Sequence, residues 1–236
     1  MQSCVAIAIF LTCITTVHAN SNNKFTADVT DYASLQRGAR LYMNECVGCH
    51  SLKYTRYDSM AKGIQITDES GKVLDQVVKD NLMFAGKSLN APILTAMTAS
   101  DAANWFGVAP PDLTLEVRYR GAQWLYQYLR SFYIDPSRPW GVNNLAFPDV
   151  AMPHVLLNLQ GEQILTSEGE LKLVKAGSMT AEQYDATIAD LVNFLCYISE
   201  PVQSQRREIG AWVLVFVGIF VVFSYLLKRE YWKDVR

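Results

Sequence analysis

The residues best suited to chemistry are two cysteines and a histidine in the segment CVGCH at 46–50. On a helix, positions i, i+3 and i+4 share one face, so Cys46, Cys49 and His50 can act on the same bound group. Two thiols at this spacing can form thioethers with the two vinyl groups of a haem, while the adjacent imidazole binds the iron. The motif therefore predicts one covalently attached c-type haem with His50 as an iron ligand.

Two other kinds of site would use the same residues. A thioredoxin-like dithiol would follow a strand, whereas the pattern before Cys46 is helical. A structural zinc site needs four ligands, for which the sequence offers Cys196 or His154 as the last. Cys4 and Cys13 lie in the apolar start of the chain, so the remaining cysteines make no complete disulfide framework. Export favours the haem, because c-type haem is attached outside the cytoplasmic membrane.

The iron of such a haem needs a sixth ligand or keeps an open position. Most methionines fill hydrophobic cores, and Met43 lies too close to His50 in sequence to reach the opposite haem face. Met152 lies in the proline-rich segment 134–153, which can drape across a haem, and His154 follows closely. The residues alone leave both open, although methionine would raise the reduction potential relative to histidine. The other candidates are Met60, Met83 and Met97, expected to be core residues in or near helices, and Met179.

The motif requires a helix to present it. Apolar residues recur at three- and four-residue spacing over 34–46, which predicts a helix capped by Ser34. Thr180 and Gln183 form a capping box that starts another helix, ending near Ser199 before Pro201. Turn residues within 163–174 indicate a short β-hairpin. The other helical candidates are 74–84, 91–106 and 113–133, the last broken at Gly121, with a loop over 134–153.

Both ends of the chain contain apolar segments. Residues 209–227 carry no charge, and as a helix these nineteen residues would span about 28 Å, close to the roughly 30 Å hydrocarbon core of a bilayer. We predict one transmembrane helix there, with interfacial aromatic residues near both ends. Residues 1–19 indicate a signal peptide, although the usual basic start is missing. Basic residues favour a cytoplasmic tail at 228–236, which leaves the domain 20–205 in the periplasm.

The charge of the chain is divided unevenly. Its formal charge is −2, but residues 20–205 contain 15 basic and 20 acidic residues, a formal charge of −5. An acidic domain argues against nucleic acid as a partner and favours a basic protein.

Several longer segments resemble the cytochrome c1 family, from about Tyr32 to the C-terminus. They are SLQRGARLYMNECVGCHSL at 34–52, APPDLTLEVRYRG at 109–121, AFPDVAMPHVL at 146–156 and FLCYISEP at 194–201, followed by the apolar run and EYWKDV. These segments are more specific than CxxCH, which many unrelated cytochromes share. The resemblance implies an all-α, class I cytochrome c-like domain with insertions, plus the C-terminal transmembrane helix.

The resemblance also implies roles for single residues. Met152 would be the axial ligand opposite His50, and Arg120 would pair with a haem propionate, because a guanidinium matches a carboxylate. Arg118 is expected on a solvated face, and Cys196 as an inert thiol. The other residues that the resemblance places at the haem, for which core packing is nearly as good an account, are Tyr126, Pro110 and Pro111.

By resemblance, the chain functions in the cytochrome bc1 complex of a bacterial inner membrane, with cytochrome b as a partner. It would accept an electron from the Rieske iron–sulfur protein and pass it to a cytochrome c, with no residue acting as acid, base or nucleophile. The complex is expected to be dimeric. Alternatives are a free-standing anchored cytochrome c that serves a terminal oxidase, a peroxidase-like haem enzyme with an open sixth position, and a zinc-binding structural domain. The PPDL segment, the loop at Met152 and the C-terminal anchor disfavour the free-standing shuttle.

Overall fold

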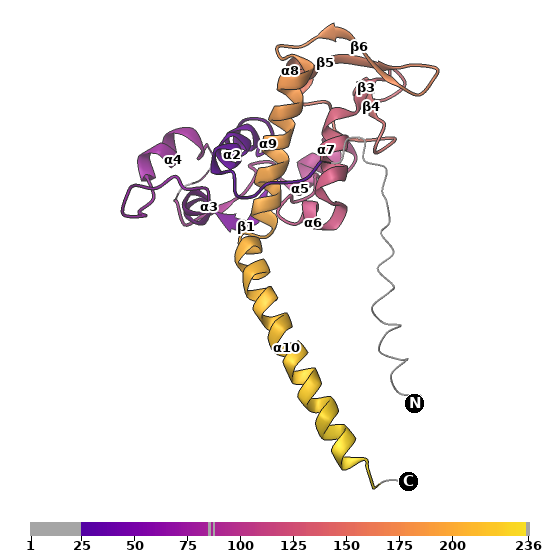
Figure 1. Cartoon of the computed structure of the whole chain (residues 1–236). Coiled ribbons are helices and arrows are strands. Elements are labelled where there is room, and N and C mark those ends of the chain that lie inside the picture. The colour runs from indigo at the N-terminus through magenta and orange to yellow at the C-terminus, as the bar shows by residue number, and fades with distance from the viewer. Residues whose placement is uncertain (1–24, 85, 87, 235–236) are drawn as a thin grey trace.

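Figure 1 shows a computed structural model that describes residues 25–84, 86 and 88–234. Helices form about half of this part of the chain, and the strands make three separate two-stranded antiparallel pairs. The helix-rich expectation is therefore confirmed, with more β structure than the single hairpin predicted. The signal peptide predicted at residues 1–19 lies outside the described residues.

Two long helices form the core of the domain. Helix α2 (Tyr32–Glu45) packs against α9 (Ala181–Ser199), which begins at the predicted capping box on Thr180. At their crossing, a Cβ atom on Gly38 would lie 2.1 Å from the carbonyl oxygen of Asp190, so the backbones touch only because residue 38 is glycine. Close approach at this position fixes how the two helices pack.

The cap of α2 differs from the prediction. Asp31 is the capping residue, and its side chain accepts a hydrogen bond of 3.0 Å from the backbone N–H of Ser34. Ser34 instead lies buried in the first turn, where its hydroxyl donates to Asp190 at 2.6 Å. Aspartate and serine cap helices about equally well. Asp31 is the cap here because the hydroxyl of Ser34 is used in the hydrogen bond to Asp190.

The segment after the motif contains shorter elements than predicted. They are β1 (Leu52–Arg56), α3 (Tyr57–Gly63), α4 (Asp75–Asn81), β2 (Pro92–Ile93) and α5 (Ala99–Phe106). The helix expected at 91–106 is wrong in its first half, where β2 pairs with β1 instead. Thr98 caps α5 by accepting from the N–H of Asp101 at 3.1 Å, and Gly107 ends it at φ 78°.

The predicted break at Gly121 is confirmed. It separates α6 (Glu116–Arg120) from α7 (Ala122–Arg130), and its φ of 91° suits glycine. Beyond α7, the segment expected as a loop contains a small hairpin, β3 (Phe132–Ile134) paired with β4 (Val142–Asn144). Short α8 (Leu157–Gln160) then leads to the predicted hairpin, β5 (Gly161–Leu165) with β6 (Leu171–Ala176).

The predicted apolar span lies within α10 (Gln203–Tyr231), which extends away from the domain (Figure 1). Among the described residues, this is the one helix long and apolar enough to cross a membrane. None of its side chains is buried in this part of the chain. Such an apolar, uncovered helix indicates a membrane-anchored protein.

Candidate haem-binding site

Both cysteines of the motif follow directly after the end of α2. The N–H of Cys46 donates to the carbonyl of Tyr42, and the chain then turns so that the N–H of His50 reaches the carbonyl of Cys46 at 2.8 Å. Both thiols are free and partly exposed. Burial raises the pKa of Cys46 to about 12 and also raises the pKa of Cys49. A redox dithiol needs a lowered pKa, so these thiols do not fit a thioredoxin-like site.

The imidazole of His50 is oriented by a backbone carbonyl. Its Nδ1 lies 2.8 Å from the oxygen of Pro111, and since a carbonyl only accepts, Nδ1 carries the proton. Nε2 is thereby left as the nitrogen that can bind a metal, an arrangement typical of metal-ligating histidines. Burial lowers the pKa of His50 despite this hydrogen bond, which favours the neutral form that a metal binds.

Further hydrogen bonds hold the motif and the PPDL segment (residues 110–113) beside each other. The N–H of Leu113 donates to the carbonyl of Ser51 at 2.9 Å, and Tyr42 donates its hydroxyl to the carbonyl of His50 at 2.5 Å. Pro110 and Cys49 line the same cavity of about 310 Å³. The PPDL segment therefore forms one wall beside CVGCH, and Pro111 contributes through its backbone oxygen.

The two candidates for the sixth ligand have different surroundings. Met152 is partly buried, and its sulfur accepts a hydrogen bond from the hydroxyl of Tyr128 at 3.3 Å. The ring of His154 instead stacks on Phe132, with centroids 4.7 Å apart and an interplanar angle of 5°. Burial lowers the pKa of His154 to about 4, as for an imidazole packed into the core. No sequence signal distinguished Tyr128, since aromatic residues recur throughout α7.

Two asparagines hold the loop that carries Met152. The side-chain oxygen of Asn144 accepts from the N–H groups of Ala146 and Phe147 at 2.9 and 3.0 Å, and its amide donates to the carbonyl of Tyr128. Asn143 accepts from the N–H of Asp149 at 2.9 Å. The buried asparagines replace the regular hydrogen bonds that this loop lacks, so its path is defined.

Arg120 lies between the α6–α7 break and this loop. Its Nε donates to Glu116 at 2.6 Å, and its guanidinium lies 4.4 Å from the ring centroid of Trp124 and 5.3 Å from that of Phe147. The negative charge of Glu116 acts to raise the pKa of His50, although burial outweighs it. Arg120 is thus a cation held by Glu116 and placed beside the loop that carries Met152.

Other predicted residues occupy different positions. Tyr126 stacks on Phe25, with centroids 4.6 Å apart, and carries the guanidinium of Arg130 over its ring. Arg118 is exposed, as expected of a solvated face, and it also donates to Glu200. Cys196 is buried on α9, and burial raises its pKa to about 12, as expected for an inert thiol.

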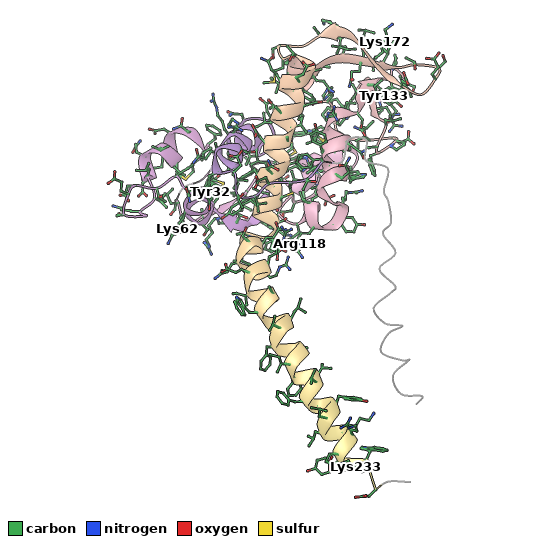
Figure 2. The ribbon with its side chains drawn as sticks, viewed as in Figure 1. Tyr32, Lys62, Arg118, Tyr133, Lys172 and Lys233 are labelled. Carbon is green, nitrogen blue, oxygen red and sulfur yellow. The ribbon has the colours of Figure 1, made fainter. Side chains whose placement is uncertain are left out.

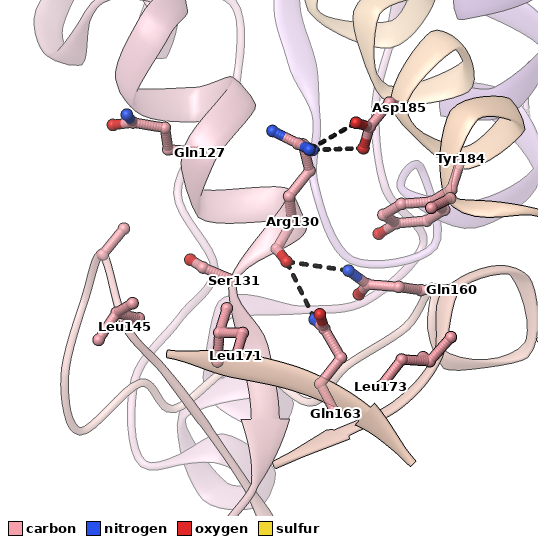
Figure 3. A pocket seen from close by; sticks show the side chains of 12 residues that line it. Gln127, Arg130, Ser131, Leu145, Gln160, Gln163, Leu171, Leu173, Tyr184 and Asp185 are labelled. Carbon is pink, nitrogen blue, oxygen red and sulfur yellow. Dashed lines mark hydrogen bonds and ion pairs between the residues drawn. The ribbon is translucent and has the colours of Figure 1, made fainter. Parts of the chain in front are cut away.

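A larger cavity, of about 530 Å³, lies near the β5–β6 hairpin and contains none of the predicted site residues. Several of its polar groups pair with one another, as Figure 3 shows: Arg130 pairs with Asp185, and the carbonyl of Arg130 accepts from Gln160 and Gln163. These contacts attach α8 and the hairpin to α7, and α7 to α9. We therefore assign this cavity a structural role.

The residues of the site fit a c-type haem. The motif offers two free thiols and an oriented imidazole. The sulfur of Met152 lies on a loop held by hydrogen bonds, and Arg120 supplies a cation suited to a carboxylate. Within the described part of the chain, no group of three or more His, Cys, Asp and Glu side chains could hold a metal ion by itself. The zinc alternative therefore lacks its ligand set there.

Comparisons with known proteins agree with this chemistry. The model of the Cytochrome C1 family matches residues 22–235. Cytochrome c1 of Allochromatium vinosum is 48% identical over 219 residues, covering 88% of this chain and 87% of that protein. A protein of Nitrosomonas europaea named ammonia monooxygenase gamma subunit is 43% identical over 214 residues, with 90% and 88% covered. A solved chain of a hyperthermophilic respiratory complex III covers 98% of this chain at 15% identity and a TM-score of 0.44. On the family match and the first relative, the chain belongs to the cytochrome c1 family, whose members bind haem and transport electrons.

Proposed function

We propose that this chain is the electron-transfer subunit of a quinol–cytochrome c oxidoreductase, the cytochrome bc1 complex. It accepts one electron from the Rieske iron–sulfur protein and passes one electron to a cytochrome c. The observation that carries the proposal is the fixed position of two candidate ligands: the imidazole of His50, held through Nδ1, and the sulfur of Met152, on a loop fixed by asparagines. The family match and the uncovered apolar helix support it.

In this proposal, the chain's own residues bind and orient one haem c in a class I cytochrome c-like domain. Cys46 and Cys49 form the two thioethers, His50 and Met152 are the axial ligands, and Arg120 offsets a propionate charge. The iron supplies reversible one-electron chemistry when the haem is bound. Less direct roles at the pocket are assigned to Tyr126, Pro110 and Pro111.

The same proposal sets the surroundings of the chain. Residues 1–19 serve as a signal peptide, 20–205 as a periplasmic domain, 209–227 as the single membrane span and 228–236 as a cytoplasmic tail. The complex lies in a bacterial inner membrane, contains cytochrome b and is dimeric. The relative named cytochrome c1, alike over most of its length, supports this setting.

The visible spectrum of the chain, purified from native membranes in mild detergent with its partners, tests the proposal. After addition of a quinol, b-type and c-type haem bands should both be present and the c band should become reduced. A c band alone that stays oxidised would favour a free-standing cytochrome c shuttle. A high-spin spectrum without a methionine–iron charge-transfer band would instead favour a peroxidase-like enzyme.

A further inference from the structure

Three charged residues from three elements meet where the domain joins the anchor. Glu200 follows the last turn of α9, Arg118 lies on α6, and Arg206 lies near the start of α10. Arg118 donates to one carboxylate oxygen of Glu200, while Arg206 donates to both, with Nη2 3.0 Å from Oε2. Figure 2 shows Arg118 beside this junction. One carboxylate therefore bridges the haem domain and the membrane helix.

The geometry distinguishes this cluster from ordinary surface ion pairs. The side chain of Glu200 is 12% exposed, whereas those of Arg118 and Arg206 are 52% and 58% exposed. The hydrogen bond from Arg206 is the largest influence on the pKa of Glu200 and lowers it, so the carboxylate is charged at neutral pH. Isolated surface pairs contribute little, but bidentate geometry and networks are the recognised exceptions.

Within the part of the chain that the structure describes, α10 is not packed into the domain. No α10 side chain is buried among the described residues. The connection from α9 is short: the N–H of Gln203 donates to the carbonyl of Glu200 at 3.1 Å, and that of Arg206 to the carbonyl of Val202 at 2.8 Å. The helix ends are thus close together, but their angle depends on side-chain contacts at the junction.

We propose that Glu200 is a positioning residue that fixes the orientation of the haem domain relative to the membrane by joining α6 to the start of α10. Helix α6 carries Arg118 toward Glu200 and Arg120 toward Trp124 and Phe147. One short helix therefore links the anchor to the cation assigned to the haem. The inference rests on the proposed function, in which the orientation of the haem sets its exposure to partner proteins.

The test uses the complete complex in its native membranes with Glu200→Gln, which keeps the side chain's size and removes its charge. Angle-dependent electron paramagnetic resonance of the oxidised haem in stacked, oriented membranes measures the tilt of the haem plane. We expect the tilt to shift or its distribution to widen, and quinol-driven reduction of the c band to slow. The visible spectrum and the midpoint potential should not change, since no contact at the predicted ligands is altered.

The matched control is Glu162→Gln, which removes the ion pair with Lys175 on the hairpin at the opposite end of the domain (Figure 1). It should leave the tilt unchanged. Arg206→Gln removes only the ion pair between Glu200 and α10, and it changes an exposed residue. It provides the test if the Glu200→Gln protein does not accumulate. Unaltered tilt in both junction variants would overturn the inference. Failure of quinol to reduce the unmodified complex would instead overturn the proposed function.

Discussion

At the residue scale, the two proposed ligands are held by different kinds of contact. The ring of His50 is oriented by a backbone carbonyl of the PPDL segment, whereas the sulfur of Met152 is approached by the hydroxyl of Tyr128. A backbone oxygen keeps its position when side chains are replaced. Substitution of Met152 therefore offers the sharper test of the ligand assignment, because that assignment depends on one flexible side chain.

We predict that Met152→Leu retains covalent haem but loses the methionine–iron charge-transfer band. Leucine conserves the volume, so the folding cost should stay below about 1.5 kcal/mol. The reduction potential should fall, within the roughly 0.8 V range that axial ligands control. The control is His154→Gln, which removes the rival imidazole from its stack on Phe132. If the unmodified protein lacked the band, and His154→Gln rather than Met152→Leu abolished the low-spin spectrum, His154 would be the sixth ligand instead.

The sequence was informative about residues that carry chemistry and uninformative about those that hold them. The spacing of CVGCH was enough to predict the thiols and the first imidazole. The partner of that imidazole is a backbone carbonyl 61 residues further along, which leaves no mark in a residue pattern. The partner of Arg118 was unpredictable for a similar reason, since an exposed arginine with no partner and an exposed arginine paired with a distant Glu200 have the same sequence signature.

At the element scale, the loop 143–149 shows how an irregular segment is kept in place. We predict that Asn144→Ala weakens Met152 ligation without loss of covalent haem, because the loop loses two accepted backbone hydrogen bonds and one donated bond. Each buried group left unpaired costs about 1–3 kcal/mol. The charge-transfer band should weaken or titrate away at lower urea concentrations than in the unmodified protein. Asn158→Ala, at an exposed position on α8, is the control and should behave normally.

The crossing of α2 and α9 supports a second prediction at this scale. Gly38→Ala should destabilise the domain by about 2 kcal/mol, because the new methyl group would meet the backbone of Asp190 and the Cβ of Phe194. For a domain of this size the unfolding temperature would fall by about 4–8 °C. Arg40→Ala, exposed on the same helix, should shift it little. An unchanged unfolding temperature for Gly38→Ala would mean that the helices can separate at no cost.

Elements with a strong local signal were predicted, and those formed by pairing were not. The capping box at Thr180 and the break at Gly121 appear where the sequence places them. By contrast, β2 at Pro92–Ile93 exists because β1 lies beside it, a partner that a local pattern does not reveal. The hairpin β3–β4 likewise lies in a segment whose prolines indicated only a loop.

At the scale of the whole molecule, charge is separated along the chain. The domain 20–205 has a formal charge of −5, from 15 basic and 20 acidic residues, while the anchor and tail together are positive. The positive end suits the cytoplasmic face of a membrane. In the proposed topology, the acidic domain would face the side on which soluble partners arrive, where it would steer a basic protein toward the site.

We predict that electron transfer from the reduced complex to a basic cytochrome c slows as salt is added. Raising the ionic strength from about 0.01 M to about 0.5 M shortens the Debye length from about 30 Å to below 10 Å, which should lower the second-order rate constant about tenfold or more. Stopped-flow measurement of c-band oxidation gives this rate directly. An acidic cytochrome c of similar reduction potential is the control, and it should react no faster at low ionic strength than at high ionic strength. Equal rates for both acceptors at every ionic strength would show that the charge of the domain does not guide docking, and that apolar contacts around the haem edge decide it instead.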